Sequence, residues 1–352
     1  MITALAIIFV FGLMVIIHEL GHFLVAKKTG VKVLEFAFGI GPKLVGVQGR
    51  ETLYSIRLLP LGGFVRFLSA EEIEEKEGMK SQELQDKSFE SKNLPQKASI
   101  IAAGPIMNFL LGAVLFIIVF TWFGIPTVSN ENVIGGLTPD MPAVNAGLEI
   151  GDRILAVNGV STPDWDAVTK QIHSSPGQQI LLQIQKAETR EILDMKITPE
   201  FDPQLEIGLI GITPPVFYKK VSVLESAQYG LKQTFEFTRL ILSYLIQMIT
   251  GQMAVELGGP IAVAQVIGEG AKQGLSNLLS LTGILSIQFG ILNLLPIPAL
   301  DGGQLAVLTY EGIRRKPVSP EKKGLIQLTG FALLIALMIA VTYKDILRIL
   351  AK

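Results

Sequence analysis

The 352-residue sequence contains no cysteine, and this absence excludes a disulfide framework, thiol catalysis and a cysteine zinc site. Charged residues are also scarce. Only 17% of the residues are Asp, Glu, Lys or Arg, and their formal sum is −1, so the sequence shows no basic surface for nucleic acid. A chain without cysteine is compatible with either side of a membrane, and the compartment must be inferred from other features.

Histidine is nearly absent as well, and two of the three histidines stand in one motif. His18 and His22 are four residues apart, so they share one face of a helix and can bind one Zn²⁺. Glu19 would lie beside the metal, where it can accept a proton from a zinc-bound water. H-E-x-x-H is a metalloprotease motif that also occurs by chance. The alternative, two core histidines with a solvated Glu, fits poorly because the surrounding residues are apolar.

Hydrophobic residues, in contrast, are abundant: they make up 49% of the chain, whose mean hydropathy is +0.47. They concentrate in runs long enough to cross a bilayer, which takes about 20 residues of helix. We expect four membrane-spanning helices, over residues 1–27, 97–124, 275–302 and 324–343. The first should remain as a membrane helix, because it lacks the basic start and the cleavage site of a signal peptide.

The distribution of Lys and Arg predicts the orientation of these helices. Basic residues are frequent in 28–96 and in 303–323, so both segments are expected in the cytoplasm. Both termini, and the segment between the second and third helices, would then lie outside. The H-E-x-x-H motif would lie toward the cytoplasmic side of a bacterial inner membrane.

The segments between the predicted helices differ in character. Residues 28–96 begin with a glycine-rich region that predicts a re-entrant β-hairpin or sheet, and they end in a charged connector. Residues 201–274 predict a linker followed by amphipathic helices at the membrane surface. Residues 303–323 predict a basic cytoplasmic loop. Short strands are expected in the first of these segments, at 43–47, 52–58 and 64–68.

Residues 127–200 have the composition of an α/β domain. The run G-L-x-x-G-D-x-I-L-x-V-N-G, from Gly147 to Gly159, resembles the PDZ domains of bacterial proteases. PDZ domains bind an extended peptide by adding it to a sheet edge, so the resemblance implies a peptide or substrate segment as partner. His173 belongs to this domain, and we expect a surface turn residue there rather than a third metal ligand.

Two polar residues inside the other hydrophobic runs need separate interpretation. Asn108 follows a Gly104-Pro105 break, and a packing role and a role in the site are equally well supported. Asp301 follows a proline-rich helix end, where Asp alone is commonly a turn former. The predicted topology brings Asp301 to the same leaflet as the two histidines. Catalytic zinc normally has three protein ligands, so we predict Asp301 as the third.

Together the motifs H-E-L-G-H, G-P-I-M-N, a PDZ-like insertion and N-L-L-P-I-P-A-L-D-G-G resemble the site-2 protease family of intramembrane zinc metalloproteases. The resemblance extends to its bacterial regulator of sigma-E protease branch. It implies one Zn²⁺ per chain, bound by His18, His22 and Asp301. It also implies Glu19 as acid and base, and Asn293 as a group that holds the substrate backbone or the oxyanion.

The same resemblance implies the substrates. They would be single-span membrane proteins, such as anti-sigma factors or remnant signal peptides, cleaved in or near the membrane after a first cut outside. Some relatives carry two PDZ domains, whereas this chain has one. A substrate helix must unwind before cleavage, because its carbonyls are otherwise hydrogen-bonded. The expected strands within 43–68 would offer an edge with which the unwound segment can pair.

Other functions are compatible with parts of the sequence. A catalytically inactive membrane scaffold could bind peptides through its PDZ domain, but it would have no need of Glu19. A metal transporter should carry His and acidic groups on several helices, and one cluster alone is evident. The predicted fold is a polytopic α-helical membrane protein with four transmembrane helices, a re-entrant β-sheet and an inserted PDZ domain.

Overall fold

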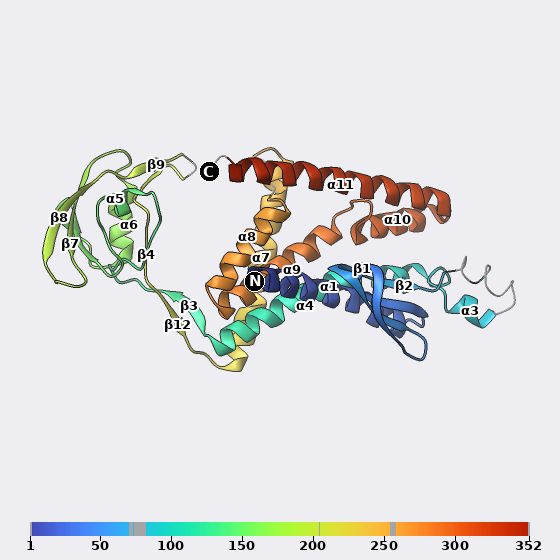
Figure 1. Ribbon diagram of the computed structural model, residues 1–352. Coiled ribbons are helices and arrows are strands. Elements are labelled where there is room, and N and C mark those ends of the chain that lie inside the picture. Colours follow the sequence, from blue (N-terminus) through green and yellow to red (C-terminus); the bar gives the residue numbers. More distant parts are fainter. Residues whose placement is uncertain (1, 70–72, 74–81, 204, 254–257, 351–352) are drawn as a thin grey trace. The chain divides into compact units, whose positions relative to one another are not determined.

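The computed structural model describes residues 2–69, 73, 82–203, 205–253 and 258–350 (Figure 1). The chain divides into two compact units. The first unit comprises Met1–Trp122 and Ser222–Lys352, and the second comprises Phe123–Val221. The first is largely helical and the second is largely β-structure. Because the second unit interrupts the first, it is an insertion between two helices of the helical unit.

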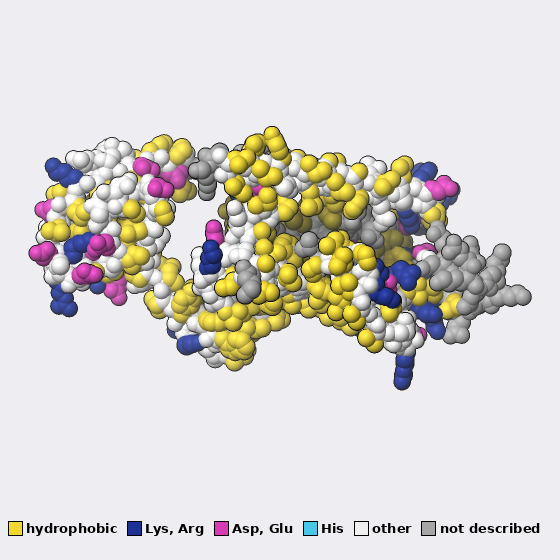
Figure 2. Space-filling view, in the orientation of Figure 1, with side chains coloured by type: hydrophobic (Ala, Val, Ile, Leu, Met, Phe, Trp, Pro, Cys, Tyr) yellow, Lys and Arg dark blue, Asp and Glu magenta, His cyan; other side chains and the backbone are white. Residues whose placement is uncertain are grey.

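Four helices among the described residues are long and apolar enough to cross a membrane. The face of the helical unit shown in Figure 2 is accordingly mostly hydrophobic, with Lys and Arg gathered on it toward the end that holds the α10–α11 connection. The four are α1 (Ile2–Lys28), α4 (Leu94–Trp122), α9 (Leu275–Leu294) and α11 (Pro320–Leu350). The unit also contains α3 (Gln82–Asp86), α7 (Val223–Ile249), α8 (Pro260–Lys272) and α10 (Asp301–Arg314).

Helix α4 is the centre of this unit, because α1, α7 and α9 all pack against it. Its contacts with α1 and α9 depend on glycine. A Cβ added at Gly21 of α1 would meet the backbone carbonyl of Ala103, and one added at Gly112 would come within 2.7 Å of Ile287. Small residues let membrane helices approach at backbone distance. The close packing of α4 against α1 and α9 fixes the place of the functional site.

Strands β1 (Val33–Gln48) and β2 (Leu53–Phe67) form one antiparallel sheet of two long, bent strands. Phe36 pairs with both Val65 and Tyr54, so the first half of β1 lies between two parts of β2. The second half of β1 pairs with one part alone. The order across the sheet is therefore 64–67, 33–38, 53–57 and 43–48, with the first and last segments as its edges.

This sheet differs from the three short strands predicted at 43–47, 52–58 and 64–68. The sequence analysis missed the strand at 33–38, and it took the glycine-rich stretches as breaks. Gly39 (φ +88°) and Gly62 (φ +94°) instead bend strands that continue on both sides. Glycine adopts positive φ without a steric penalty, so it turns a strand without ending it.

The region around the third predicted helix also differs from expectation. Helix α9 ends at Leu294, so the prediction of one helix over 275–302 was wrong in its last part. Helix α10 (Asp301–Arg314) occupies most of the segment 303–323 that was predicted to be a loop. Proline lacks a backbone donor and ends a helix, which explains the break between α9 and α10. Helix α11 extends beyond 324–343 at both ends.

The second unit has a four-stranded antiparallel sheet, a single core of buried aliphatic residues, and two short helices. It reaches Val221, so the predicted linker at 201–274 begins too early. The sheet order is β6 (Val160–Ser161), β5 (Arg153–Val157), β7 (Ile180–Gln185) and β8 (Ile192–Ile197). The helices are α5 (Pro142–Asn145) and α6 (Trp165–His173). The paired short strands are β3 (Ile125–Val128) with β12 (Val216–Lys219), β4 (Gly136–Leu137) with β11 (Ile212–Thr213), and β9 (Glu200–Asp202) with β10 (Ile207–Leu209).

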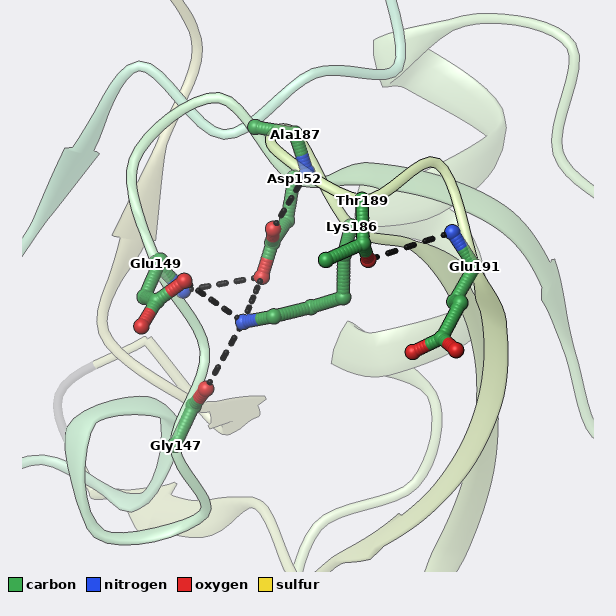
Figure 3. Close-up of polar contacts among 7 residues, drawn as sticks. All are labelled: Gly147, Glu149, Asp152, Lys186, Ala187, Thr189 and Glu191. Atoms are coloured by element: carbon green, nitrogen blue, oxygen red, sulfur yellow. Dashed lines mark hydrogen bonds and ion pairs between the residues drawn. The ribbon is translucent and has the colours of Figure 1, made fainter.

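A buried carboxylate joins two turns of this unit (Figure 3). Asp152, with no exposed surface, accepts hydrogen bonds from the backbone N–H of Glu149 (2.9 Å) and Ala187 (3.1 Å) and from Nζ of Lys186 (3.0 Å). The Glu149 and Asp152 carboxylates hold the pKa of Lys186 above its usual range. The buried Asp152 of the PDZ-like motif is thus explained by the hydrogen bonds that it accepts in these turns.

Candidate metal centre

The two histidines of the H-E-x-x-H motif face α4 from the buried side of α1. The Nε2 atoms of His18 and His22 lie 3.2 Å apart. Nδ1 of His22 lies 2.8 Å from the backbone carbonyl of Ile100. A carbonyl can only accept, so the ring proton of His22 belongs on Nδ1 and Nε2 keeps its lone pair. This tautomer is the one that binds a metal through Nε2.

Asp301, the first residue of α10, completes a triangle of ligand atoms. Its Oδ2 lies 3.1 Å from Nε2 of His18 and 3.4 Å from Nε2 of His22. Atoms placed tetrahedrally at about 2.0–2.2 Å from Zn²⁺ lie about 3.3–3.6 Å from one another. Oδ2 is buried and receives no hydrogen bond from a described residue. Two ring nitrogens and one carboxylate oxygen therefore converge in a buried place, and this donor set fits Zn²⁺.

Helix α4 leaves space for this triangle by presenting a glycine. A Cβ added at Gly104 would meet Nε2 of His22 and would lie 2.8 Å from Nε2 of His18. The next residue, Pro105, cannot donate a backbone hydrogen bond to the preceding turn of α4. In an α-helix the acceptor four residues before Pro105 is the carbonyl of Ile101, whereas the carbonyl that meets Nδ1 of His22 is that of Ile100. Helix α4 continues from Leu94 to Trp122, so the break predicted at Gly104-Pro105 was wrong, and it is the missing side chain of Gly104 that makes room for the site.

The turn between α9 and α10 places Asp301 against the histidines. Ala299 adopts φ +77°, a conformation that is strained by roughly 1–3 kcal/mol for a residue with a side chain. Gly302 and Gly303 follow Asp301, and a Cβ on either would meet backbone carbonyls of the turn. Glycine at these positions lets the first turn of α10 pack directly on the end of α9.

A cavity of about 440 Å³ opens over the three candidate ligands. Glu19 lines it, and a Cβ added at Gly63 would come within 3.1 Å of Glu19 Cγ, so the sheet approaches the carboxylate closely. Asn293, 7% exposed, also lines it and donates a hydrogen bond to the carbonyl of Phe289 (3.0 Å). The structure therefore brings all five predicted site residues to one cavity, from three helices. They are His18, Glu19, His22, Asn293 and Asp301.

The sequence analysis missed several other residues of this cavity. Phe289 places its ring edge-on to His18, with centroids 5.3 Å apart. It precedes Asn293 by four residues, so the helical period could have identified it. The segment 62–65 of β2 also lines the cavity, and no sequence pattern pointed to it. His173 lies in the second unit, as expected, but it is the half-buried last residue of α6 and not a surface turn residue.

A model of peptidase family M50 matches residues 6–337. The chain belongs to this family. It is 36% identical over 417 residues to the zinc metalloprotease RasP of Geobacillus kaustophilus, covering 98% of this chain and 97% of that protein. It is 33% identical over 423 residues to the regulator of sigma-W protease RasP of Bacillus subtilis, covering 99% of each chain.

This M50 chain is therefore a zinc metalloprotease with the cofactor Zn²⁺, and the predicted membership of the site-2 proteases is confirmed. Its apolar helices and its relatives identify it as an inner-membrane protein. Part of the chain is also similar to the solved PDZ domain of an SdrC-like protein from Listeria innocua. That match has 23% identity and a TM-score of 0.21, and it covers 24% of this chain and 93% of the other.

Proposed function

We propose that this M50 protein is an intramembrane endopeptidase whose Zn²⁺ is held by His18, His22 and Asp301. The observation that carries the proposal is the convergence of two Nε2 atoms and one Oδ2 atom at separations of 3.1–3.4 Å. The atoms come from α1 and from α10, which follows α9, so the site lies among hydrophobic helices. The substrates are single-span membrane proteins.

The residues of the cavity divide the chemistry among them. When bound, Zn²⁺ supplies Lewis-acid polarisation of the scissile carbonyl. Glu19 takes a proton from the attacking water and delivers it to the leaving nitrogen, which completes the hydrolysis. Asn293 presents its amide to the substrate backbone or to the developing oxyanion. The hydrophobic helices around the cavity limit access of bulk water to these groups.

The substrate is bound as a strand. The 64–67 edge of the sheet adjoins the cavity, and Phe64 and Val65 line it. An extended segment that adds to this edge would expose its carbonyls to the metal, whereas a helix would not. The PDZ-like unit binds a peptide or a further part of the substrate outside the membrane, after an earlier cut there has shortened the substrate.

Two substitutions test the proposal on purified full-length protein with a model single-span substrate. Glu19→Gln should keep one Zn²⁺ per chain and lose cleavage by about 10²–10⁴-fold, because only the proton carrier is removed. Asp301→Ala should lose zinc after mild chelation, because two imidazoles alone make a weak site. Glu188→Gln, at an exposed turn of the second unit, is the control.

Cleavage by Glu19→Gln at the wild-type rate would show that another group carries the proton. Unchanged zinc content in Asp301→Ala would place the third ligand elsewhere.

A further inference from the structure

Helix α4 brings a buried amide to the first zinc ligand. Asn108 has no exposed surface, and its side chain lies 2.8 Å from Nδ1 of His18. Nδ1 is the ring nitrogen opposite Nε2, which faces Asp301. The sequence could not distinguish a packing role for Asn108 from a role in the site. The contact with His18 makes it the neighbour of a ligand.

The protonation of His18 decides which amide atom must face it. A neutral imidazole that binds metal through Nε2 carries its proton on Nδ1, and that N–H needs an acceptor. An amide nitrogen cannot accept, so the oxygen of Asn108 must take this position. Rotation of the amide by 180° exchanges the two atoms. With the nitrogen toward His18, Oδ1 of Asn108 has no hydrogen-bond partner among the described residues, so rotation breaks no bond of the oxygen.

Asn108 is held firmly enough to orient a ring. Oγ of Ser286, on α9, donates a hydrogen bond of 2.8 Å to its backbone carbonyl. A Cβ added at Gly290 would lie 3.4 Å from Cβ of Asn108, so the two helix backbones are close at this point. His22 has an equivalent partner, because its Nδ1 meets the carbonyl of Ile100. Helix α4 thus offers one acceptor to each histidine.

We propose that Asn108 is a positioning residue of the zinc site, whose Oδ1 accepts the Nδ1 proton of His18. The bond fixes the tautomer and the ring orientation in which Nε2 of His18 points at the metal. This inference rests on the proposed ligand set of His18, His22 and Asp301. Groups that orient a metal-binding histidine in this way typically change metal affinity by about 10–100-fold when they are removed.

The first test measures zinc affinity of the full-length protein by competition with a chelator. Asn108→Leu keeps a similar volume and removes the acceptor, so the Kd for zinc should rise about 10–100-fold. Asn108→Asp keeps an acceptor, so its Kd should stay near the wild-type value. Thr282→Val is the matched control, because Thr282 is equally buried and, among the described residues, its hydroxyl bonds only the Leu278 carbonyl of its own helix.

The second test uses the small number of histidines. With ring-¹⁵N histidine, the chain gives signals from three imidazoles, and His173→Gln removes the one outside the site. In the zinc-loaded wild type, His18 should show a protonated, hydrogen-bonded Nδ1 and a metal-bound Nε2. Asn108→Leu should shift the Nδ1 signal of His18 and leave that of His22 unchanged, because His22 has the Ile100 carbonyl as its own acceptor.

Three results would overturn the role of Asn108. These are an unchanged Kd in Asn108→Leu, an equal loss of affinity in Asn108→Asp, and a zinc-bound Nδ1 of His18 in the wild type. The first two results must be compared with the zinc affinity of His18→Ala. If His18→Ala retains zinc fully, the proposed ligand set has failed, whereas zinc that depends on His18 but not on Asn108 overturns this inference alone.

Discussion

At the scale of single residues, the metal centre depends on glycines as much as on its ligands. Gly104 leaves room for both imidazoles, Gly63 lets the sheet reach Glu19, and Gly302 seats the first turn of α10. At each of these positions an added Cβ would come within 3.1 Å of a neighbouring atom, so that neighbour would have to move. A site whose groups are shifted binds and reacts poorly, even with every ligand present.

Gly104→Ala tests this dependence. The added methyl carbon would meet Nε2 of His22, so the imidazoles must move and the zinc affinity should fall by about tenfold or more. Gly324→Ala is the control, because a Cβ there has no atom within 4 Å. Zinc content after graded chelation and the thermal midpoint of both variants measure the effect. Wild-type zinc retention in Gly104→Ala would show that α4 does not confine the ligands.

A single residue could be predicted when the evidence for it lies in the neighbouring sequence. His18, Glu19 and His22 were predictable because three residues of one helix turn make the motif. The prediction of Asp301 required the membrane topology, which was inferred from the distribution of lysine and arginine. The contact of Asn108 with His18 was not predictable, because α4 is hydrophobic on nearly all sides. A helix without a polar face does not reveal from its period which side meets a neighbour.

At the scale of elements, one edge of the β1–β2 sheet lies at the cavity. Its two edges, 64–67 and 43–48, differ in surroundings: only the former belongs to a strand segment that lines the cavity. An unpaired edge is a template for another strand. The sequence predicted strands here but not their order, since the order depends on bends at Gly39 and Gly62 that resemble breaks in the sequence.

Proline substitutions test whether the 64–67 edge binds substrate. Proline removes a backbone donor, so at one of positions 64–66 it should reduce cleavage sharply, with zinc content and thermal midpoint retained. The same scan over 44–46 is the matched control on the opposite edge, where cleavage should persist. Residues that destabilise the substrate helix should speed cleavage. Normal turnover in every folded proline variant would show that this edge does not bind substrate and that the sheet has only a structural role.

The junction of α10 and α11 depends on a buried carboxylate. Glu311, 7% exposed, accepts hydrogen bonds from Nζ of Lys323 and the N–H of Val318, both at 2.7 Å. Burial alone would raise the pKa of Glu311, but these two bonds outweigh it and hold the pKa below the usual value. A lowered pKa contributes stability above the unfolded value of about 4.3, and this contribution is lost as pH falls through the lowered pKa.

We therefore expect Glu311→Gln to lower the thermal midpoint of the detergent-solubilised protein at neutral pH. The difference from wild type should shrink as the pH falls from about 4.3 through the lowered pKa, because Glu311 is protonated first in the unfolded chain and then in the folded protein. Thermal unfolding at a series of pH values between 7 and 3 measures it. A difference that stays constant down to pH 3 would mean that the ion pair with Lys323 does not stabilise the junction.

At the scale of the whole molecule, the absence of cysteine makes the orientation measurable. From the frequency of basic residues we propose that 28–96 and 303–323 lie in the cytoplasm and the second unit outside. Gln85→Cys and Ser161→Cys, both at exposed positions, should label from opposite faces of the membrane with an impermeant thiol reagent. The unmodified chain is the blank, because it has no thiol. Labelling of both from one face would contradict the proposed topology.

The inserted unit begins and ends on neighbouring strands. Ile125 pairs with Lys219 and Val128 with Val216, so the chain enters and leaves along one antiparallel ribbon. In evolutionary terms the second unit could be exchanged, duplicated or deleted at a single junction, while the first unit kept its helices. The substrate recruitment proposed for this unit could then change by one recombination event, without a change to the proposed metal site.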